Sequence, residues 1–153
     1  MYCAFDKLKQ LLCSAPILCY PDFDREFILQ TDASDVGLGA VLSQIDKSGS
    51  EHVVAYASKT LSPREKNYST TEKEAFAIQL GTQHFRVYLL GRKFTIRTDH
   101  SALSWLNSME PKGRIARWLM DLQEFDFEVK HRAGRVHNNA DALLRLRHTY
   151  IHK

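Results

Sequence analysis

The sequence is short of the features that mark secreted and membrane proteins. Its three cysteines, Cys3, Cys13 and Cys19, are odd in number and have no histidine nearby, so they suit neither a disulfide framework nor a zinc site. No apolar run approaches the roughly 20 residues of a membrane-spanning helix. The first residues lack the basic and apolar regions of a signal peptide. We therefore expect an intracellular, cytoplasmic protein that does not contact membranes.

A strong charge of one sign is also lacking. The 153 residues carry 21 Lys and Arg against 18 Asp and Glu, a net charge of +3. Residues 1–111 hold 12 basic and 13 acidic residues, whereas residues 112–153 hold 9 and 5. A basic C-terminal third suits an anionic partner such as nucleic acid, although a solvated basic surface is the simpler explanation.

Hydrophobic periodicity predicts strands and helices in alternation. Strands are expected over residues 25–32, 36–44, 52–58, 93–98 and 127–131. Helices are expected over residues 4–12, 69–90, 102–106, 115–125 and 139–146, the second of them beginning with a capping box formed by Ser69 and Glu72. After the first helix the order is β-β-β-α-β-α-α-β-α, which predicts an α/β fold with a mixed sheet.

Two of the predicted strands end in the same pattern, Thr-Asp-x-Ser. The two segments are Thr31-Asp32-Ala33-Ser34 and Thr98-Asp99-His100-Ser101. The first strand is joined to the second by a hairpin, and the long helix leads across to the fourth strand. Connections that leave in opposite directions create a switch point, where α/β proteins place their sites. If the two strands are parallel neighbours, Asp32 and Asp99 share one crevice. Taken singly, each is equally well explained as a turn cap.

Two further acids strengthen the case for a site. Glu74 lies on the expected core-facing side of the long helix, where an acid is unusual without a partner. Asp141 begins the last predicted helix, where a favourable interaction with the helix dipole is the simpler explanation. Four carboxylates in one crevice would repel one another unless hard cations such as Mg²⁺ were bound. Two such ions favour hydrolysis of a phosphodiester.

Ordered motifs covering nearly the whole chain resemble the ribonuclease H domain of Ty3/gypsy-type retrotransposon polymerases. They read TDASDVGLGAVLSQ, YSTTEKEAFAI, FTIRTDHSAL and HRAGRVHNNADAL. The resemblance implies an RNase H-like fold, with a five-stranded mixed sheet and helices on both faces. It divides the chain into an N-terminal helix and connector over residues 1–24, as follows reverse transcriptase, an RNase H-like domain over residues 25–148, and a tail over residues 149–153.

The resemblance also implies an activity, Mg²⁺-dependent cleavage of the RNA strand of RNA–DNA hybrids during reverse transcription. Its metal ligands would be Asp32, Glu74, Asp99 and Asp141, holding two Mg²⁺ ions, with Mn²⁺ as a substitute. Glu74 is preferred to Glu72, because Glu72 already serves the capping box and Glu74 shares a helical stripe with Ile78. The parent polyprotein would also be an RNA-directed DNA polymerase. Its reverse transcriptase domain would be a partner, and an active element would place both in a virus-like particle.

Other residues are weaker candidates. His131 lies ten residues before Asp141, where related ribonucleases H carry a mobile-loop histidine, so it is a candidate for proton transfer or product release; equally, it simply ends the fifth strand. Candidates for nucleic-acid binding are Ser34, Lys112, Arg114 and Arg117. For the arginines, a solvated helix face beside a buried tryptophan is at least as good an explanation. The alternative function is a non-catalytic nucleic-acid-binding module, domesticated or dependent on its polymerase.

Overall fold

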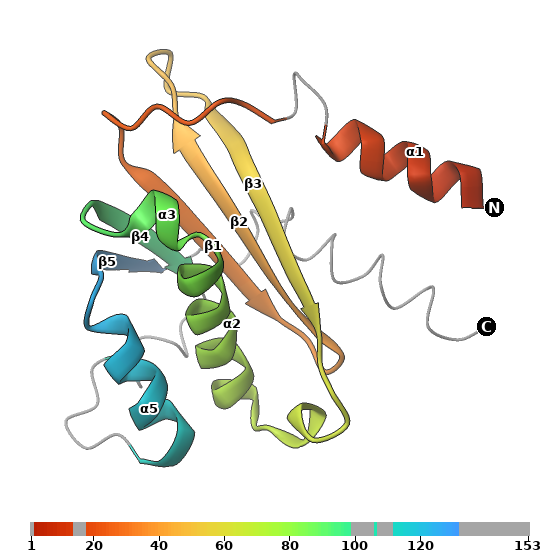
Figure 1. The fold of residues 1–153 in the computed structure, drawn as a ribbon, viewed down its shortest axis with the longest axis vertical. Coiled ribbons are helices and arrows are strands. Elements are labelled where there is room, and N and C mark those ends of the chain that lie inside the picture. Colours follow the sequence, from red (N-terminus) through yellow and green to blue (C-terminus); the bar gives the residue numbers. More distant parts are fainter. Residues whose placement is uncertain (1, 14–17, 99–105, 107–111, 132–153) are drawn as a thin grey trace.

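A mixed five-stranded sheet forms the centre of the protein (Figure 1). The computed structural model describes residues 2–13, 18–98, 106 and 112–131. The sheet has the order β3-β2-β1-β4-β5 and consists of β1 (Phe27–Ala33), β2 (Gly37–Ile45), β3 (Glu51–Thr60), β4 (Lys93–Thr98) and β5 (Asp126–His131). The first three strands form an antiparallel meander, and β4 lies parallel to both β1 and β5. The predicted mixed sheet with a central first strand is confirmed.

The helices begin and end near the predicted positions, with one exception. They are α1 (Tyr2–Cys13), a short 3-10 helix η1 (Glu65–Asn67), α2 (Thr70–His84), α3 (Arg86–Leu89) and α5 (Gly113–Leu122). The single helix predicted over residues 69–90 is divided at Phe85, whose φ of −97° and ψ of 19° depart from helical values. Phe85 is 2% exposed, so its burial in the core accompanies the break. No described helix has the length and apolarity to cross a membrane.

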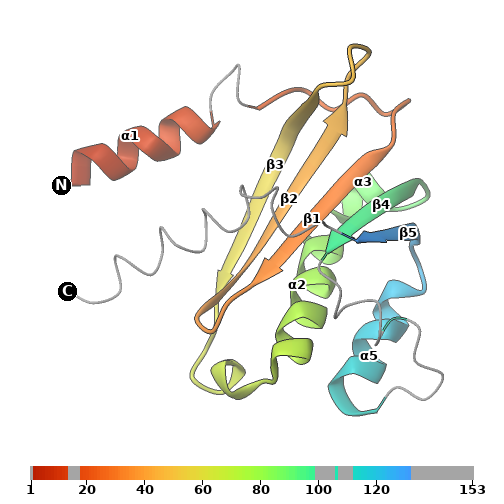
Figure 2. The ribbon, with the colours of Figure 1, turned by 180° about the vertical axis from the view of Figure 1, so that it is seen from behind.

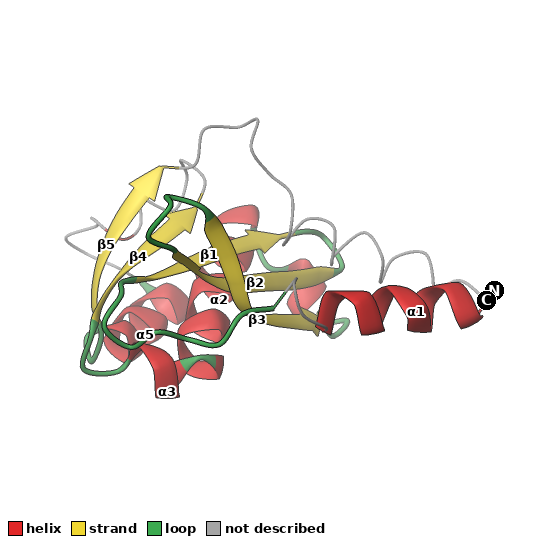
Figure 3. Cartoon of the chain, turned by 90° about the horizontal axis from the view of Figure 1, so that it is seen from above, coloured by secondary structure: helices red, strands yellow, loops and turns green. Residues whose placement is uncertain are grey.

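The helices α2, α3 and α5 lie together on one side of the sheet (Figure 3). These helices do not cover the opposite face, which is turned toward the viewer in Figure 2. The predicted helix over residues 139–146 lies outside the described residues. So does the predicted helix over residues 102–106, apart from Leu106, which is helical. The expectation of helices on the second face of the sheet therefore stays a prediction.

The core forms between α2 and the strands it covers. Alternate residues of β1, Phe27 and Leu29, are fully buried with Ile78 of α2 in one cluster, as the alternation of side chains along a strand requires. The helix comes close to the sheet at Gly81. A Cβ atom at this position would lie 3.2 Å from both Ala40 Cβ and Leu29 Cδ1. This close approach fixes the distance between the last turn of α2 and the strands β1 and β2.

The capping box at the start of α2 is present as predicted. Glu72 N donates to Ser69 Oγ at 3.2 Å, and Ser69 N donates to Glu72 Oε2 at 2.9 Å. The substitution Ser69→Ala is expected to lower the free energy of unfolding by about 1 kcal/mol, because an N-terminal amide of the helix loses its acceptor. Urea denaturation followed by circular dichroism measures the change. Thr70→Ala, at the next exposed position, leaves both bonds in place, and an equal loss in this control would contradict the assignment.

Candidate active site

The parallel pair β1 and β4 ends at the edge of the sheet where Asp32 lies. Residues 27–30 of β1 pair with residues 94–97 of β4, and β4 ends at Thr98. Asp32 is the last residue but one of β1, opposite Gly39 of β2. It is half-buried, and its Oδ1 accepts a hydrogen bond from Ala33 N at 3.0 Å. Asp99 follows Thr98 in the sequence but lies outside the described residues.

Glu74 lies in the first turns of α2, which pack on β1 and β2. It is half-buried and one helical stripe connects it to Ile78 and Thr82, both fully buried. The buried Ile78 and Thr82 show that this stripe of α2 faces the core; that the Glu74 side chain itself points toward the sheet stays a prediction. An acid on such a stripe is kept away from bulk solvent more than a surface glutamate, which suits a group that binds a cation.

Glu72, two residues earlier, has a different environment. Its carboxylate caps the helix at Ser69 and also accepts from Arg114 Nη1 at 2.8 Å. The hydrogen bond from the Ser69 backbone, together with the hydrogen bond and the positive charge of Arg114, holds the pKa of Glu72 below its usual value despite partial burial. Glu72 therefore serves the capping box, as predicted, and in addition pairs with Arg114, which holds α5 to the start of α2.

Two contacts hold the end of β1 to the start of α2. Ala33 packs in a small apolar cluster with Ala77 of α2 and the fully buried Leu38. In the turn between β1 and β2, Asp35 Oδ1 accepts from Lys73 Nζ at 2.9 Å, and this pairing lowers the pKa of Asp35. Both contacts lie within three residues of Asp32 or Glu74. The end of β1 and the start of α2, which carry the two acids, therefore belong to one connected part of the fold, and both elements are labelled in Figure 1. Sequence reasoning missed Lys73 and Asp35, although a lysine flanked by core-facing helix positions was the available signal.

The second half of the predicted acidic set is not described. Asp99 and Asp141 lie outside the described residues, and the described part of the chain contains no group of three or more His, Cys, Asp or Glu side chains that could hold a metal. The two described acids, Asp32 and Glu74, offer carboxylate oxygens, which are the ligands that Mg²⁺ and Mn²⁺ prefer. The donor chemistry fits the expected ions. The complete four-carboxylate site stays a prediction.

His131 is the last residue of β5, opposite Thr98 of β4, and is exposed. The interpretation that it ends the fifth strand is therefore confirmed. Because Thr98 immediately precedes Asp99 in the sequence, this position is also compatible with the role in proton transfer or product release, which stays a prediction.

The candidates for nucleic-acid binding differ in how far they are already engaged. The Ser34 hydroxyl closes the turn between β1 and β2, accepting from Gly37 N at 3.1 Å and donating to Gly37 O at 3.1 Å. Arg114 pairs with Glu72 and lies over the ring of Tyr68, 4.2 Å from its centroid. Lys112 and Arg117 are exposed. These two are the better placed to meet a phosphate backbone.

Trp118 of α5 is buried, as expected of an aromatic residue on a core-facing helix stripe. It is 9% exposed and stacks on Phe76 with ring centroids 5.2 Å apart and planes 2° apart. Tyr68 packs against both rings. The tryptophan therefore anchors α5 to α2 and presents Arg117, on the neighbouring position, to solvent.

A polar network covers the face of the sheet opposite α2. Glu51 of β3 is its centre, and it accepts hydrogen bonds of 2.6 Å from Gln30 Nε2, Ser43 Oγ and Arg97 Nη1. Burial raises the pKa of Glu51, but these hydrogen bonds and the charge of Arg97 outweigh it, so the pKa is lowered. The network joins all four strands from β3 to β4 and gives the carboxylate three donors.

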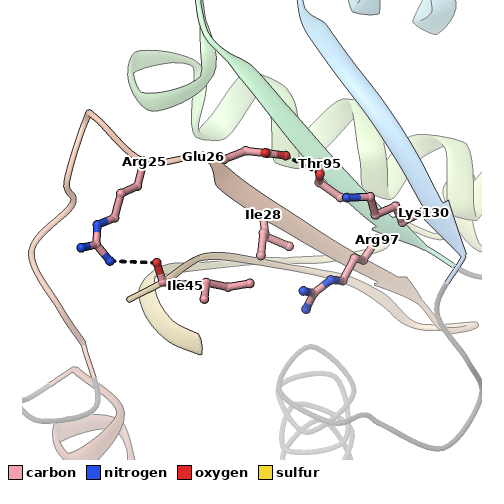
Figure 4. A pocket seen from close by; sticks show the side chains of 7 residues that line it. All are labelled: Arg25, Glu26, Ile28, Ile45, Thr95, Arg97 and Lys130. Carbon is pink, nitrogen blue, oxygen red and sulfur yellow. Dashed lines mark hydrogen bonds between the residues drawn. The ribbon is translucent and has the colours of Figure 1, made fainter. Parts of the chain in front are cut away.

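A pocket of about 290 Å³ lies beside this network (Figure 4). It contains neither Asp32 nor Glu74, and it is lined by Arg25, Glu26, Ile28, Ile45, Thr95, Arg97 and Lys130. Its cationic side chains are each paired within the protein, Arg25 with Asp22, Arg97 with Glu51 and Lys130 with Glu128. Because these charges are already compensated, the pocket is not a prepared anion site.

The Glu51 network makes stability depend on pH. A carboxylate whose pKa is lowered by folding contributes stability above its unfolded value, and that contribution is lost as the pH falls through the lowered folded value. Glu51→Gln is expected to cost about 1 kcal/mol at neutral pH, where hydrogen bonds to a charged group are lost. Urea unfolding between about pH 7 and pH 3 should show a steeper loss for the unsubstituted protein than for the variant. Parallel curves would contradict this assignment.

The comparisons with known proteins agree with this fold. Residues 22–125 match the model of the RNase H-like domain found in reverse transcriptase. The chain is 46% identical over 145 residues to the retrovirus-related Pol polyprotein from transposon 297 of Drosophila melanogaster, and 42% identical over 148 residues to the transposon Tf2-3 polyprotein of Schizosaccharomyces pombe. Each match covers 94% of this chain but only 13% and 11% of the relative.

Solved structures show the same fold at low sequence identity. The foamy viral protease-reverse transcriptase in complex with an RNA/DNA hybrid aligns with a TM-score of 0.61 at 16% identity, over 88% of this chain and 19% of that one. RNase H1 from the archaeon Halobacterium salinarum aligns with a TM-score of 0.56 at 15% identity, over 77% of this chain and 93% of that one. The family model and the relatives agree with the motifs in the sequence. The chain therefore belongs to the RNase H-like domains of reverse transcriptases, as found in retrotransposon Pol polyproteins of the Ty3/gypsy type.

Proposed function

We propose that this chain is a divalent-metal-dependent ribonuclease that cleaves the RNA strand of RNA–DNA hybrids during reverse transcription of a long-terminal-repeat retrotransposon. The observation that carries the proposal is the end of β1, where half-buried Asp32 lies in the strand paired parallel to β4 and is joined through Lys73 and Asp35 to the helix of Glu74. Family membership supports it, because the relatives are Pol polyproteins. The polymerase activity would belong to the rest of such a polyprotein.

Asp32 and Glu74, completed by Asp99 and Asp141, would hold two Mg²⁺ ions, or Mn²⁺ in their place. When bound, such ions supply positive charge that activates the attacking water and stabilises charge on the phosphate. The chain's own contribution is to hold the backbone that carries these two acids in place, because α2 and β1 are joined by packing and by an ion pair. Lys112 and Arg117 would attract the phosphate backbone to this edge, and His131 would accept or release a proton near the end of β5.

The test is cleavage of a labelled RNA strand in an RNA–DNA hybrid, compared with the same RNA in an RNA duplex. We expect cutting of the hybrid in Mg²⁺ and none in a chelator. Binding without cleavage would favour the non-catalytic module, and cleavage only after addition of the polymerase would favour a dependent domain. Either result would overturn the proposal for the isolated chain.

Asp32→Asn should remove cleavage and leave hybrid binding nearly unchanged, since the carboxylate would hold metal rather than nucleic acid. Residues that only support metal ligands typically cost about 10–100-fold when changed, so this loss should exceed about 100-fold. The rate of cleavage and the dissociation constant of the hybrid measure the two effects. Asp22→Asn, in the connector before β1, is the matched control and should cleave at the unsubstituted rate.

Glu74 and Glu72 offer a second contrast within one helix. Glu74→Gln should reduce cleavage more than about 100-fold while changing the free energy of unfolding little. Glu72→Gln should do the reverse, because it weakens the capping box and the pair with Arg114 but leaves the proposed metal ligands intact. Cleavage assays and urea denaturation on both variants decide between them. A larger loss of cleavage for Glu72→Gln would show that the wrong glutamate has been assigned.

A further inference from the structure

Lys73 is an unusual lysine. Its side chain is 8% exposed, whereas the side chain of its partner Asp35 is 96% exposed. Lysine side chains are rarely buried to this extent unless they are paired. The Nζ atom donates to Asp35 Oδ1 at 2.9 Å, across 38 positions of sequence. A buried ammonium group therefore reaches out of α2 to a carboxylate on the surface turn between β1 and β2.

The position of this ion pair relative to the proposed metal ligands is specific. Lys73 directly precedes Glu74 in α2, and Asp35 follows Asp32 by three residues. The turn that carries Asp35 is itself held firmly, because Ser34 N donates to Gly37 O at 2.9 Å and Leu61 N donates to Val36 O at 2.9 Å. A displacement of Lys73 or of the turn would thus be passed to both described acids.

We propose that Lys73 and Asp35 form a clamp that positions Asp32 and Glu74 for binding of divalent metal ions, with Lys73 as a positioning residue rather than a catalytic one. This inference rests on the proposed function and assigns a supporting role to two side chains outside the acidic set. Groups that support metal ligands fix their orientation, and their loss typically lowers metal affinity or activity by about 10–100-fold.

A purely structural role makes a different prediction. The four-carbon stem of a lysine can pack on apolar neighbours while its charge finds any convenient partner. In that case Lys73→Met would keep most of the packing, and Asp35→Asn, at a 96% exposed side chain, would change nothing. The clamp requires both substitutions to act on metal binding, and through the same interaction.

The experiment measures the dissociation constant of Mn²⁺ by electron paramagnetic resonance on the full chain, together with kcat and KM for the hybrid. Lys73→Met and Asp35→Asn should each weaken Mn²⁺ binding by about 10-fold and lower kcat with little change in KM. The double variant should bind Mn²⁺ no more weakly than the single variant with the lower affinity, because the two substitutions remove the same interaction. Asp35→Glu keeps the carboxylate and should restore most of the affinity.

Ile78→Val is the matched control for general loosening of α2. Ile78 is fully buried on the same helix, so its loss of a methylene group lowers stability without touching the ion pair. At equal loss of stability, the control should keep its Mn²⁺ affinity. If Lys73→Met and Asp35→Asn also keep theirs, or if Ile78→Val loses as much as they do, the clamp is overturned.

The readouts separate the clamp from the proposed function. An unsubstituted chain that cleaves the hybrid while all variants bind Mn²⁺ equally well retains the function and overturns the clamp. A chain that binds Mn²⁺ with the expected order of variants but leaves the hybrid intact supports the clamp and overturns the proposed function. A chain that neither binds Mn²⁺ nor cleaves overturns both.

Discussion

The parallel pairing of β1 with β4 is the constraint on which the rest of the structure depends. Parallel neighbours require a long crossover connection, and here β2, β3 and α2 supply it. The crossover places β1 in the centre of the sheet with the hairpin on one side and β4 on the other. It also carries α2 back over the sheet, so that its first turns lie near the end of β1. Asp32 therefore lies near the end of the central strand of the sheet.

The helix α2 contributes through close packing and through charge. Gly81 permits contact of the helix with Leu29 and Ala40, which fixes its distance from the sheet. At its other end the capping box, the pair of Glu72 with Arg114, and the pair of Lys73 with Asp35 fix its start against α5 and the β1–β2 turn. Glu74 lies between these two anchors. The backbone that carries Glu74 is therefore fixed at both ends of the helix, which would lower the entropy cost of binding a cation at the proposed site.

Different interactions stabilise the two faces of the sheet. The face under α2 is an apolar core with fully buried side chains such as Phe27, Leu29 and Ile96. The other face is crossed by hydrogen bonds and ion pairs centred on Glu51, and its cations are paired within the protein. Polar groups in such a network are costly to leave unpaired, so this face specifies the register of β1, β3 and β4 as well as contributing stability.

Much of this protein was determined by its sequence. The spacing of its apolar residues predicted the strands, and the order of strands and helices predicted the central position of β1. The Ser69–Glu72 pattern predicted the start of α2. Each of these features depends on local spacing. The capping role of Glu72 followed from the same local rules. Only the tertiary structure decided that Phe85 breaks the long helix, that Glu51 gathers partners from three other strands, and that Lys73 reaches Asp35 across 38 positions. Those contacts join residues remote in the chain, and no local pattern encodes which distant side chain will be within hydrogen-bond reach once the sheet has formed.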